Sequence, residues 1–295
     1  MADWSPVAHR AAITVFTEHI GDPDELVRRL QPFDVVFVMR ERTPLPRSVL
    51  ERLPRLKMIA STGPFNAAID MEAAADCGIH VGTTGGTVDS TVELTWALIL
   101  SVVRELPAQI ASVRNGGWQV SVGRELSGKV LAVLGLGRIG GRVARIGTAF
   151  GMTVIAWSQN LTPQAAAEFG AVYVDRETFF RTADVLTIHL RLSERSRGIV
   201  GAAELAAMKP EAYVVNTSRG PLVDERALVD ALRNHTIAGA GLDVFDTEPL
   251  PPEHPLRTLE NAVLTPHIGY VADRPYRIFF GDAVRAIAEW MDRSG

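Results

Sequence analysis

The sequence predicts an α/β fold with parallel sheets and crossover helices, divided between two domains. Short apolar runs alternate with amphipathic patterns along almost the whole chain, which is the order that parallel strands joined by helices require. At 295 residues the chain is longer than a single hydrophobic core usually serves. A glycine-rich turn, G-L-G-R-I-G, follows one of the apolar runs within a second series of strands.

The first unit is expected to cover roughly eighty residues, a length taken from spacing alone. Asp22 is a suitable N-cap for a helix with Pro23 in its first turn, and another helix is expected around 46–53. Gly78 is typical of the end of a third helix. The expected strands are the apolar runs at 12–16, 34–39, 56–62 and 79–81.

A long helical pattern at 91–106, which resumes as far as 115–118, connects this unit to the next. The second unit starts with G-K-V-L-A-V-L-G. Its expected strands are 130–134, 152–157, 171–174, 184–188, 213–216, 237–243 and 262–265. The stretch 273–291 is amphipathic and helical, and a lone helix at the end of such a chain is expected to return to the first domain.

Composition excludes several classes of protein. Hydrophobic residues make up 47% and charged residues 22%, which is ordinary for a globular enzyme, and the net charge of −4 argues against nucleic acid as a partner. The longest apolar run, at 96–103, is too short to span a bilayer, and the N-terminus lacks signal-peptide order. The single cysteine, Cys77, rules out an internal disulfide. We expect a cytoplasmic protein.

The glycine-rich turn predicts a dinucleotide site because strand, turn, helix and strand follow one another around it. Gly135 permits the tight turn, Gly137 lets the backbone approach a pyrophosphate, and Gly140 lets helix and strand pack closely. The helix N-terminus adds unpaired N–H groups for the phosphates. The alternative, a packing turn without a ligand, is disfavoured by this context.

The next strand lacks the carboxylate that would hold a ribose 2′-hydroxyl. It ends at Ser158, followed by Gln159 and Asn160, none of them acidic or basic. Without that carboxylate, nothing at the end of this strand repels the 2′-phosphate of NADP, but no basic residue in Ser158–Asn160 selects for it either. Arg191, in H-L-R-L-S-E-R, is either a solvated arginine or a partner for a 2′-phosphate. The cofactor is therefore expected to be NAD(P), with a slight preference for NADP.

Three later segments place chemically capable side chains at the carboxyl ends of strands, where open α/β sheets bind ligands. Arg219 follows Y-V-V-N-T-S and offers a planar fork for a carboxylate. Asp243 and Glu248 lie in G-L-D-V-F-D-T-E-P. His267, in T-P-H-I-G-Y, can exchange a proton near neutral pH. Singly, each has a structural alternative as a turn, loop or packing residue.

Together, G-L-G-R-I-G, N-T-S-R-G-P-L-V-D and T-P-H-I-G resemble the D-isomer-specific 2-hydroxyacid dehydrogenases, and the likeness extends from 61–70 to the final helix. The resemblance implies a Rossmann-type doubly wound cofactor domain, residues 96–267. That domain would be inserted into a smaller flavodoxin-like α/β substrate domain formed by residues 1–95 and 268–295.

The resemblance also implies residue roles. Arg219 would bind the substrate carboxylate, His267 would be the acid/base, and Glu248 would hold its imidazolium. Thr62 and Gly63, in the loop 61–66, would present backbone N–H groups to the substrate carboxylate. No metal is expected. The expected cofactor contacts are Gly135, Gly137, Arg138, Ile139, Gly140, Ser158, Asn160, Thr217 and Asp243.

The expected function is NAD(P)-dependent reduction of a small 2-oxo acid to a D-2-hydroxy acid, as in glyoxylate and hydroxypyruvate reductases. Two alternatives stay open. One is a phosphorylated-hydroxyacid dehydrogenase, disfavoured by the lack of an extra regulatory domain; the other is a non-catalytic NAD(P)-sensing interaction protein. We expect a homodimer with a contribution from 91–118, and neither a nucleic-acid nor a membrane partner. Arg40 is either a substrate contact or, more simply, a surface ion-pair residue, and Tyr270 is expected near the site.

Overall fold

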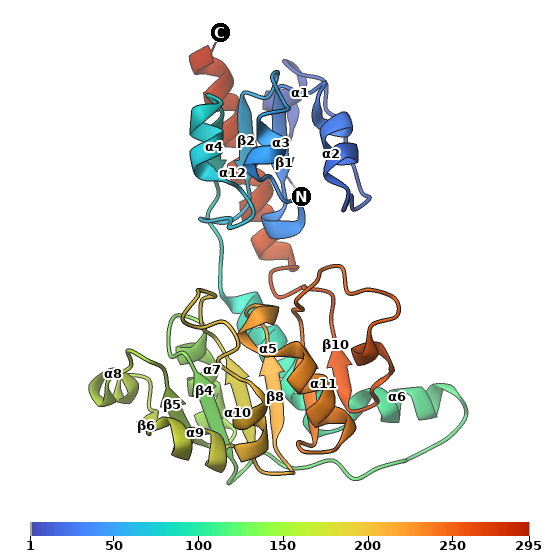
Figure 1. Ribbon diagram of the computed structural model, residues 1–295, viewed down its shortest axis with the longest axis vertical. Coiled ribbons are helices and arrows are strands. Elements are labelled where there is room, and N and C mark those ends of the chain that lie inside the picture. Colours follow the sequence, from blue (N-terminus) through green and yellow to red (C-terminus); the bar gives the residue numbers. More distant parts are fainter. Residues whose placement is uncertain (1, 295) are drawn as a thin grey trace. The chain divides into compact units, whose positions relative to one another are not determined.

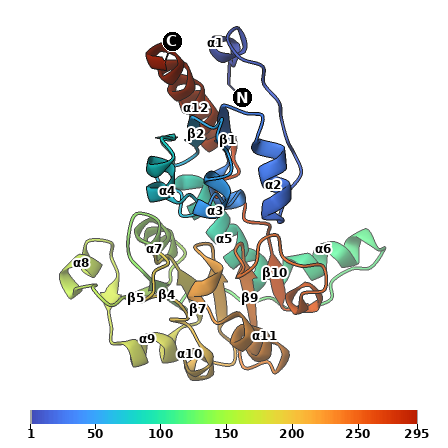
Figure 2. The same cartoon turned by 45° about the horizontal axis from the view of Figure 1, so that its top comes forward.

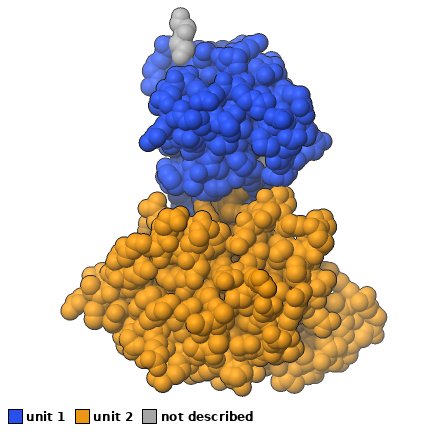
Figure 3. All heavy atoms as spheres, in the orientation of Figure 1, with its two compact units in different colours: residues 1–87, 271–295 blue, residues 88–270 orange. Residues whose placement is uncertain are grey.

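The computed structural model describes residues 2–294, and the chain divides into two compact units (Figure 3). Unit 1 comprises Met1–Thr87 and Val271–Gly295, and unit 2 comprises Val88–Tyr270. These limits differ from the expected 95/96 and 267/268. The helix that begins at Asp89 packs on three strands of the unit 2 sheet, so the whole of it belongs to unit 2.

Unit 2 is built on seven parallel strands in the order β10-β9-β8-β7-β4-β5-β6. Their bounds are β4 Val130–Leu134, β5 Thr153–Trp157, β6 Val172–Tyr173, β7 Val185–Ile188, β8 Tyr213–Asn216, β9 Gly239–Leu242 and β10 Ala262–Leu264. All seven strands expected in this region are confirmed. The order reverses between β4 and β7, so the topological switch point of a Rossmann-type sheet lies there.

Helices cover both faces of this sheet (Figures 1 and 2). In β4, Leu131 and Val133 join a core with residues of α5 and α7, whereas Ala132 and Leu134 join a core with residues of α9, α10 and α11. A strand buried on both faces must be apolar throughout, which explains the unbroken V-L-A-V-L run. The helices are α5 Asp89–Val103, α6 Leu106–Arg114, α7 Gly140–Ala149, α8 Pro163–Ala167, α9 Arg176–Thr182, α10 Ala202–Ala207 and α11 Glu225–Arg233, with short 3-10 turns η2 Gly220–Leu222 and η3 Pro255–Thr258.

The expected helix at 91–106 is divided in two. α5 ends at Val103, and Glu105 has a left-handed backbone with φ of 51°, so α6 starts in a new direction. α6 extends away from the sheet in Figures 1 and 2. Among the described residues no single helix has the length and apolarity to cross a bilayer, although α5 and α6, bent by 69°, pass that test as a pair.

Unit 1 contains a parallel sheet of three strands in the order β1-β2-β3. Its elements are α1 Ser5–Ala8, α2 Pro23–Leu30, β1 Val35–Val38, η1 Arg40–Arg42, α3 Arg47–Leu50, β2 Met58–Ser61, α4 Met71–Asp76, β3 His80–Thr83 and α12 Asp273–Ser294. Asp22 caps α2 by accepting the Asp24 N–H, as expected. α12 packs on β2, β3 and α1, which confirms that the final helix returns to the first unit.

The expected strand at 12–16 is wrong. This run is irregular, and Ile13, Val15 and Phe16 are exposed. The ring of Phe16 packs edge-on against Phe33 at 5.7 Å, and the guanidinium of Arg29 lies over it at 5.0 Å. Apolar alternation alone does not make a strand, because a strand also needs a hydrogen-bonded neighbour, and this run is held to its surroundings by ring contacts instead.

Candidate active site

The turn after β4 has the shape that a pyrophosphate requires. Gly135 has φ of +93°, and a Cβ there would lie 2.9 Å from the carbonyl oxygen of His189. A Cβ on Gly140, the first residue of α7, would lie 2.2 Å from the Gly135 carbonyl oxygen. A Cβ on Gly137 would meet nothing within 4 Å. The two outer glycines therefore serve packing, while Gly137 leaves open space before the N-terminus of a ten-residue helix, as a bound dinucleotide would need.

Two further residues of this turn belong to the expected cofactor contacts. Arg138 is exposed on the turn, and Ile139 is partly buried and packs against the core beneath α7. Their positions are compatible with a cofactor lying along the turn, and their contact with it stays a prediction.

The loops after β5 and β7 line a common pocket of about 280 Å³. Gln159 donates a side-chain hydrogen bond to the carbonyl of Arg195, which ties the two loops together at 3.1 Å. Both arginines of the pocket, Arg191 and Arg195, are exposed residues. The lining consists of Ser158, Gln159, Asn160, Leu190, Arg191, Ser193, Arg195 and Ser196. Ser158 and Asn160, expected to contact the ribose, therefore line the same pocket as Arg191 and Arg195. The sequence had indicated only Arg191 as a possible phosphate contact.

His267 and Glu248 are joined directly. The Nδ1 of His267 lies 2.5 Å from Glu248 Oε2, and the Phe245 N–H donates to Glu248 Oε1 at 3.0 Å. Because a carboxylate only accepts hydrogen bonds, Nδ1 must carry a proton, which leaves Nε2 as the nitrogen for exchange with a ligand. Tyr270 packs edge-on against the imidazole with ring centroids 5.7 Å apart.

Asp243 anchors the turn that carries His267. It is 1% exposed, and its carboxylate accepts hydrogen bonds from Thr265 Oγ1, Ile268 N–H and Gly269 N–H at 2.6 to 2.8 Å. Burial raises the pKa of Asp243, and these three donors oppose that rise. His267 itself has a left-handed backbone, φ of 54°, which the surrounding bonds must maintain. The sequence suggested a cofactor contact for Asp243 and gave no sign of this anchoring role.

Arg219 lies in a turn that Asn216 organises. Asn216 Nδ2 donates to the Arg219 carbonyl, and its Oδ1 accepts the Ser218 N–H. The guanidinium of Arg219 donates to the Ser218 carbonyl at 2.7 Å. Thr217, expected to contact cofactor, has its hydroxyl 2.8 Å from the hydroxyl of Thr95 in α5, so its side chain binds the helix and its backbone remains at the strand end.

The loop at 61–66 belongs to unit 1. The N–H of Thr62 donates to the Val38 carbonyl and the N–H of Gly63 donates to the Thr84 hydroxyl, so both are engaged within the unit. Arg40 packs on this loop, since a Cβ on Gly63 would lie 2.2 Å from its guanidinium, and its Nε lies 3.5 Å from Glu41. The ion pair expected for Arg40 is present, whereas substrate contact by Arg40, Thr62 and Gly63 stays a prediction.

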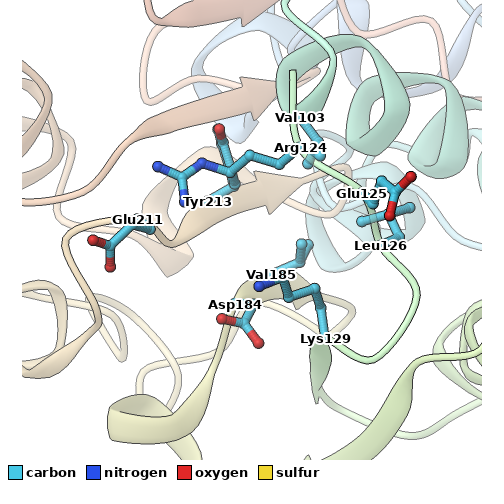
Figure 4. A pocket seen from close by; sticks show the side chains of 9 residues that line it. All are labelled: Val103, Arg124, Glu125, Leu126, Lys129, Asp184, Val185, Glu211 and Tyr213. Atoms are coloured by element: carbon cyan, nitrogen blue, oxygen red, sulfur yellow. The ribbon is translucent and has the colours of Figure 1, made fainter. Parts of the chain in front are cut away.

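A second pocket of unit 2, about 250 Å³, lies at the opposite edge of the sheet, where β4, β7 and β8 begin (Figure 4). Its lining carries charges of both signs, from Arg124, Lys129, Glu125, Asp184 and Glu211. Asp184 binds Lys209 at 2.8 Å and accepts the Val130 N–H, and Arg124 lies beside Tyr213, whose pKa is raised by burial. None of the expected site residues lines it.

Comparison with known proteins decides the family. Residues 96–269 match the model of the D-isomer specific 2-hydroxyacid dehydrogenase, NAD binding domain. The chain belongs to this family. It is 44% identical over 229 residues to the glyoxylate reductase of Aeropyrum pernix, covering 74% of this chain and 68% of that protein. It is 35% identical over 266 residues to the hydroxypyruvate reductase of Thermotoga maritima, covering 88% and 85%.

A solved structure agrees with this membership. The phosphoglycerate oxidoreductase of Vibrio cholerae superposes with a TM-score of 0.91 at 39% identity, covering 95% of this chain and 91% of that one. The resemblance and the fold class predicted from the sequence are thus confirmed, and the chain is an oxidoreductase of the D-2-hydroxyacid dehydrogenase family with a Rossmann NAD-binding domain.

Proposed function

We propose that this protein uses NAD(P)H to reduce a small 2-oxo acid, of the glyoxylate or hydroxypyruvate type, to a D-2-hydroxy acid. The observation that carries the proposal is the 2.5 Å pair of His267 and Glu248 at the carboxyl ends of strands in a dinucleotide-binding sheet. That pair fixes Nε2 of His267 as the exchanging nitrogen. Relatives named glyoxylate and hydroxypyruvate reductase support the substrate class.

Each residue has a defined task in this proposal. The bound nicotinamide supplies the hydride. Arg219 holds the substrate carboxylate with its planar fork, and its charge polarises the ketone. His267 donates the Nε2 proton to the oxygen as negative charge develops there, and takes it back in the reverse direction. Glu248 keeps the ring in one tautomer and stabilises its charged form.

We also propose a preference for NADPH over NADH. The end of β5 offers Ser158 and Asn160 where a carboxylate would repel a 2′-phosphate, and Arg191 and Arg195 line the same pocket. Arginine is well suited to phosphate because its guanidinium makes charge-assisted, two-pronged hydrogen bonds.

A phosphorylated hydroxyacid is the second candidate substrate, and Arg40 is the observation that favours it. Its guanidinium rests on Gly63, so unit 1 offers a cation beside the loop expected to bind an anionic group. The Vibrio cholerae relative named phosphoglycerate oxidoreductase is consistent with this candidate.

A paired assay separates these candidates. NADPH and NADH oxidation would be followed with glyoxylate, hydroxypyruvate, pyruvate, bulkier 2-oxo acids and 3-phosphohydroxypyruvate. We expect the highest kcat/KM with an unphosphorylated small 2-oxo acid and NADPH. A higher value with the phosphorylated acid would favour the second candidate. Cofactor binding without reduction of any member of the panel would favour an NAD(P)-sensing interaction protein instead.

We further propose a homodimer formed through α6 and the segment that follows it. Large apolar side chains are exposed there, Trp118 at 79% and Val122 at 82%, together with Ile110, Val113 and Val120. An exposed apolar group of this kind is typical of a protein interface. We expect sedimentation at twice the chain mass and a shift toward monomer in Trp118→Arg. A monomeric wild type would refute the dimer.

A further inference from the structure

The segment between β9 and β10 carries Glu248. The contacts that hold this segment in place therefore determine where the Glu248 carboxylate lies. The segment has no regular structure before η3, so side chains must hold it. One candidate is Glu225, the first residue of α11, whose side chain is 18% exposed. Sequence reasoning gave Glu225 no role, because acidic residues are common in the first turn of a helix.

The Glu225 carboxylate binds the segment at two places. Oε2 accepts the backbone N–H of Asp246 at 3.1 Å, and Oε1 lies 3.0 Å from His254 Nε2. Asp246 precedes Glu248 and His254 follows it. A single carboxylate on a rigid helix therefore fixes the chain on both sides of Glu248.

His254 can make this contact in only one neutral form. Its Nδ1 accepts the N–H of Leu256 at 3.3 Å, which caps η3, so the proton of the neutral ring must be on Nε2 and point toward Glu225. The imidazole thus links Glu225 to the end of the segment, and both of its nitrogens are used. Leu256, 1% exposed, packs in the core of unit 2 and holds the end of the segment near η3 there.

The Phe245–Asp246 peptide, whose N–H donates to Glu225, lies close to both Glu248 and the turn that carries Arg219. Phe245, adjacent to Asp246, donates its N–H to Glu248 Oε1. A Cβ on Gly220, the residue after Arg219, would lie 2.1 Å from the Phe245 carbonyl carbon and 2.6 Å from the Asp246 nitrogen. A shift of this peptide would therefore displace Glu248 and press on the turn that carries Arg219.

The arrangement is maintained against an electrostatic cost. The pKa of Asp246 is raised, first by burial and next by the negative charges of Glu225 and Asp224, with Arg197 and His254 opposing the rise.

We propose that Glu225 and His254 are positioning residues that fix the turn from which Glu248 reaches His267. Their role rests on the proposed function, since it acts through the acid/base pair of that reaction. Neither residue touches substrate or cofactor in this role. Loss of Glu225 frees the Asp246 peptide, lets Glu248 leave His267, and returns the His267 ring to the tautomer mixture of a solvated imidazole.

The test combines kinetics with histidine NMR on the full chain. The variants are Glu225→Ala, Glu225→Gln and His254→Gln, with Glu253→Gln as the matched control, because Glu253 is an exposed acid on the same segment. Ring ¹⁵N shifts, assigned by the signal that disappears in His267→Gln, report which nitrogen of His267 carries the proton. Displacement of a catalytic group by an ångström lowers turnover by about 10²-fold, so we expect a fall of that order in kcat for Glu225→Ala.

In the same variant we expect cofactor KM within about twofold of wild type and a mixed His267 tautomer, as an unconstrained ring would show. Glu225→Gln retains an acceptor for the Asp246 N–H but opposes the His254 Nε2–H, so its kcat should lie between those of wild type and Glu225→Ala. Glu253→Gln should match wild type. A lower Tm with the His267 tautomer and kcat unchanged would overturn the proposal. Wild-type protein that reduces no 2-oxo acid would refute the proposed function, while the tautomer change would still decide the positioning role.

Discussion

The two ends of the expected cofactor groove in unit 2 are built differently. At the catalytic end, the buried Asp243 carboxylate accepts three hydrogen bonds. Nδ1 of His267 lies 2.5 Å from Oε2 of Glu248, whose side chain is 34% exposed. At the other end, the pocket beside Ser158 is lined by short polar side chains and by the exposed residues Arg191 and Arg195.

The two ends differ because proton transfer requires exact placement of its groups and cofactor discrimination does not. Proton transfer requires a ring held in one tautomer and one place. The Glu248 contact sets the tautomer, and the backbone N–H groups bound by the buried Asp243 carboxylate hold the turn that carries the ring. Discrimination between a hydroxyl and a phosphate needs only a suitable charge within reach, which exposed side chains supply. We therefore expect substitutions at the catalytic end to cost far more than substitutions at the adenosine end.

The largest effect is expected from the reacting residues. His267→Ala removes the proton donor, and Arg219→Ala removes the carboxylate anchor and the charge that polarises the ketone. Each should lower kcat/KM by about 10³-fold, the size typical of a lost acid/base group for His267 and of a lost electrostatic stabiliser for Arg219. Cofactor binding, followed by fluorescence titration with NADPH, should change little. Unchanged kcat/KM in either variant would refute the assigned roles.

Glu248→Gln should have the next largest effect. The amide keeps an acceptor for the His267 Nδ1–H but removes the negative charge that stabilises the imidazolium, and its NH₂ opposes the Phe245 N–H. We expect kcat to fall by about 10²-fold with KM for the 2-oxo acid nearly constant, the pattern of an interaction made mainly in the transition state. A rise in KM at constant kcat would instead place Glu248 in substrate binding.

Much of unit 2 was predictable because its signals are local. The V-L-A-V-L run before G-L-G-R-I-G defines strand, turn and helix within a few residues, and every expected strand of unit 2 is present. The segments of Arg219, Glu248 and His267 also follow strand ends that the sequence reveals. The family match confirms the resemblance that these motifs predicted.

The remainder depends on contacts between distant residues. Residues 12–16 have a strand-like pattern but no ladder, and pattern alone cannot show whether a neighbour is available. The bonds from Glu225 to Asp246 and His254 join residues more than twenty positions apart. Arg195 lies in the same segment as Arg191, but the sequence does not show which residues of that loop turn toward the end of β5. Such pairings become visible only in three dimensions.

His189, between the two ends, should make stability depend on pH. It follows β7 at the switch point, and desolvation of its imidazole lowers its pKa to about 3. An unfolded chain takes up this proton below about pH 6.5 whereas the folded chain does not, so this contribution is present above pH 6.5 and lost as pH falls. From pH 7 to pH 5 the free energy of unfolding should fall by at most about 2 kcal/mol through this residue.

Urea unfolding at both pH values, followed by circular dichroism, checks this expectation. His189→Gln should flatten the dependence by that amount, because the amide does not titrate. His19→Gln, at an exposed histidine, should leave the dependence as in wild type. An equal slope in His189→Gln and wild type would show that the imidazole is solvated.

The smallest effect is expected at the adenosine end. Removing Arg191 and Arg195 together takes away two exposed cations, each worth about 0.2–1 kcal/mol against a phosphate, so KM for NADPH should rise by about tenfold. KM for NADH should stay within about twofold, because its ribose hydroxyl does not need the charge.

Added salt should raise KM for NADPH in wild type and much less in the double variant, since exposed charges are screened. Arg181→Ala, at an exposed position of α9, controls for the loss of a single surface cation away from this pocket. Equal rises in KM for NADPH and KM for NADH would mean that the arginines bind the adenosine part common to both cofactors. The adenosine end would then not select between the cofactors.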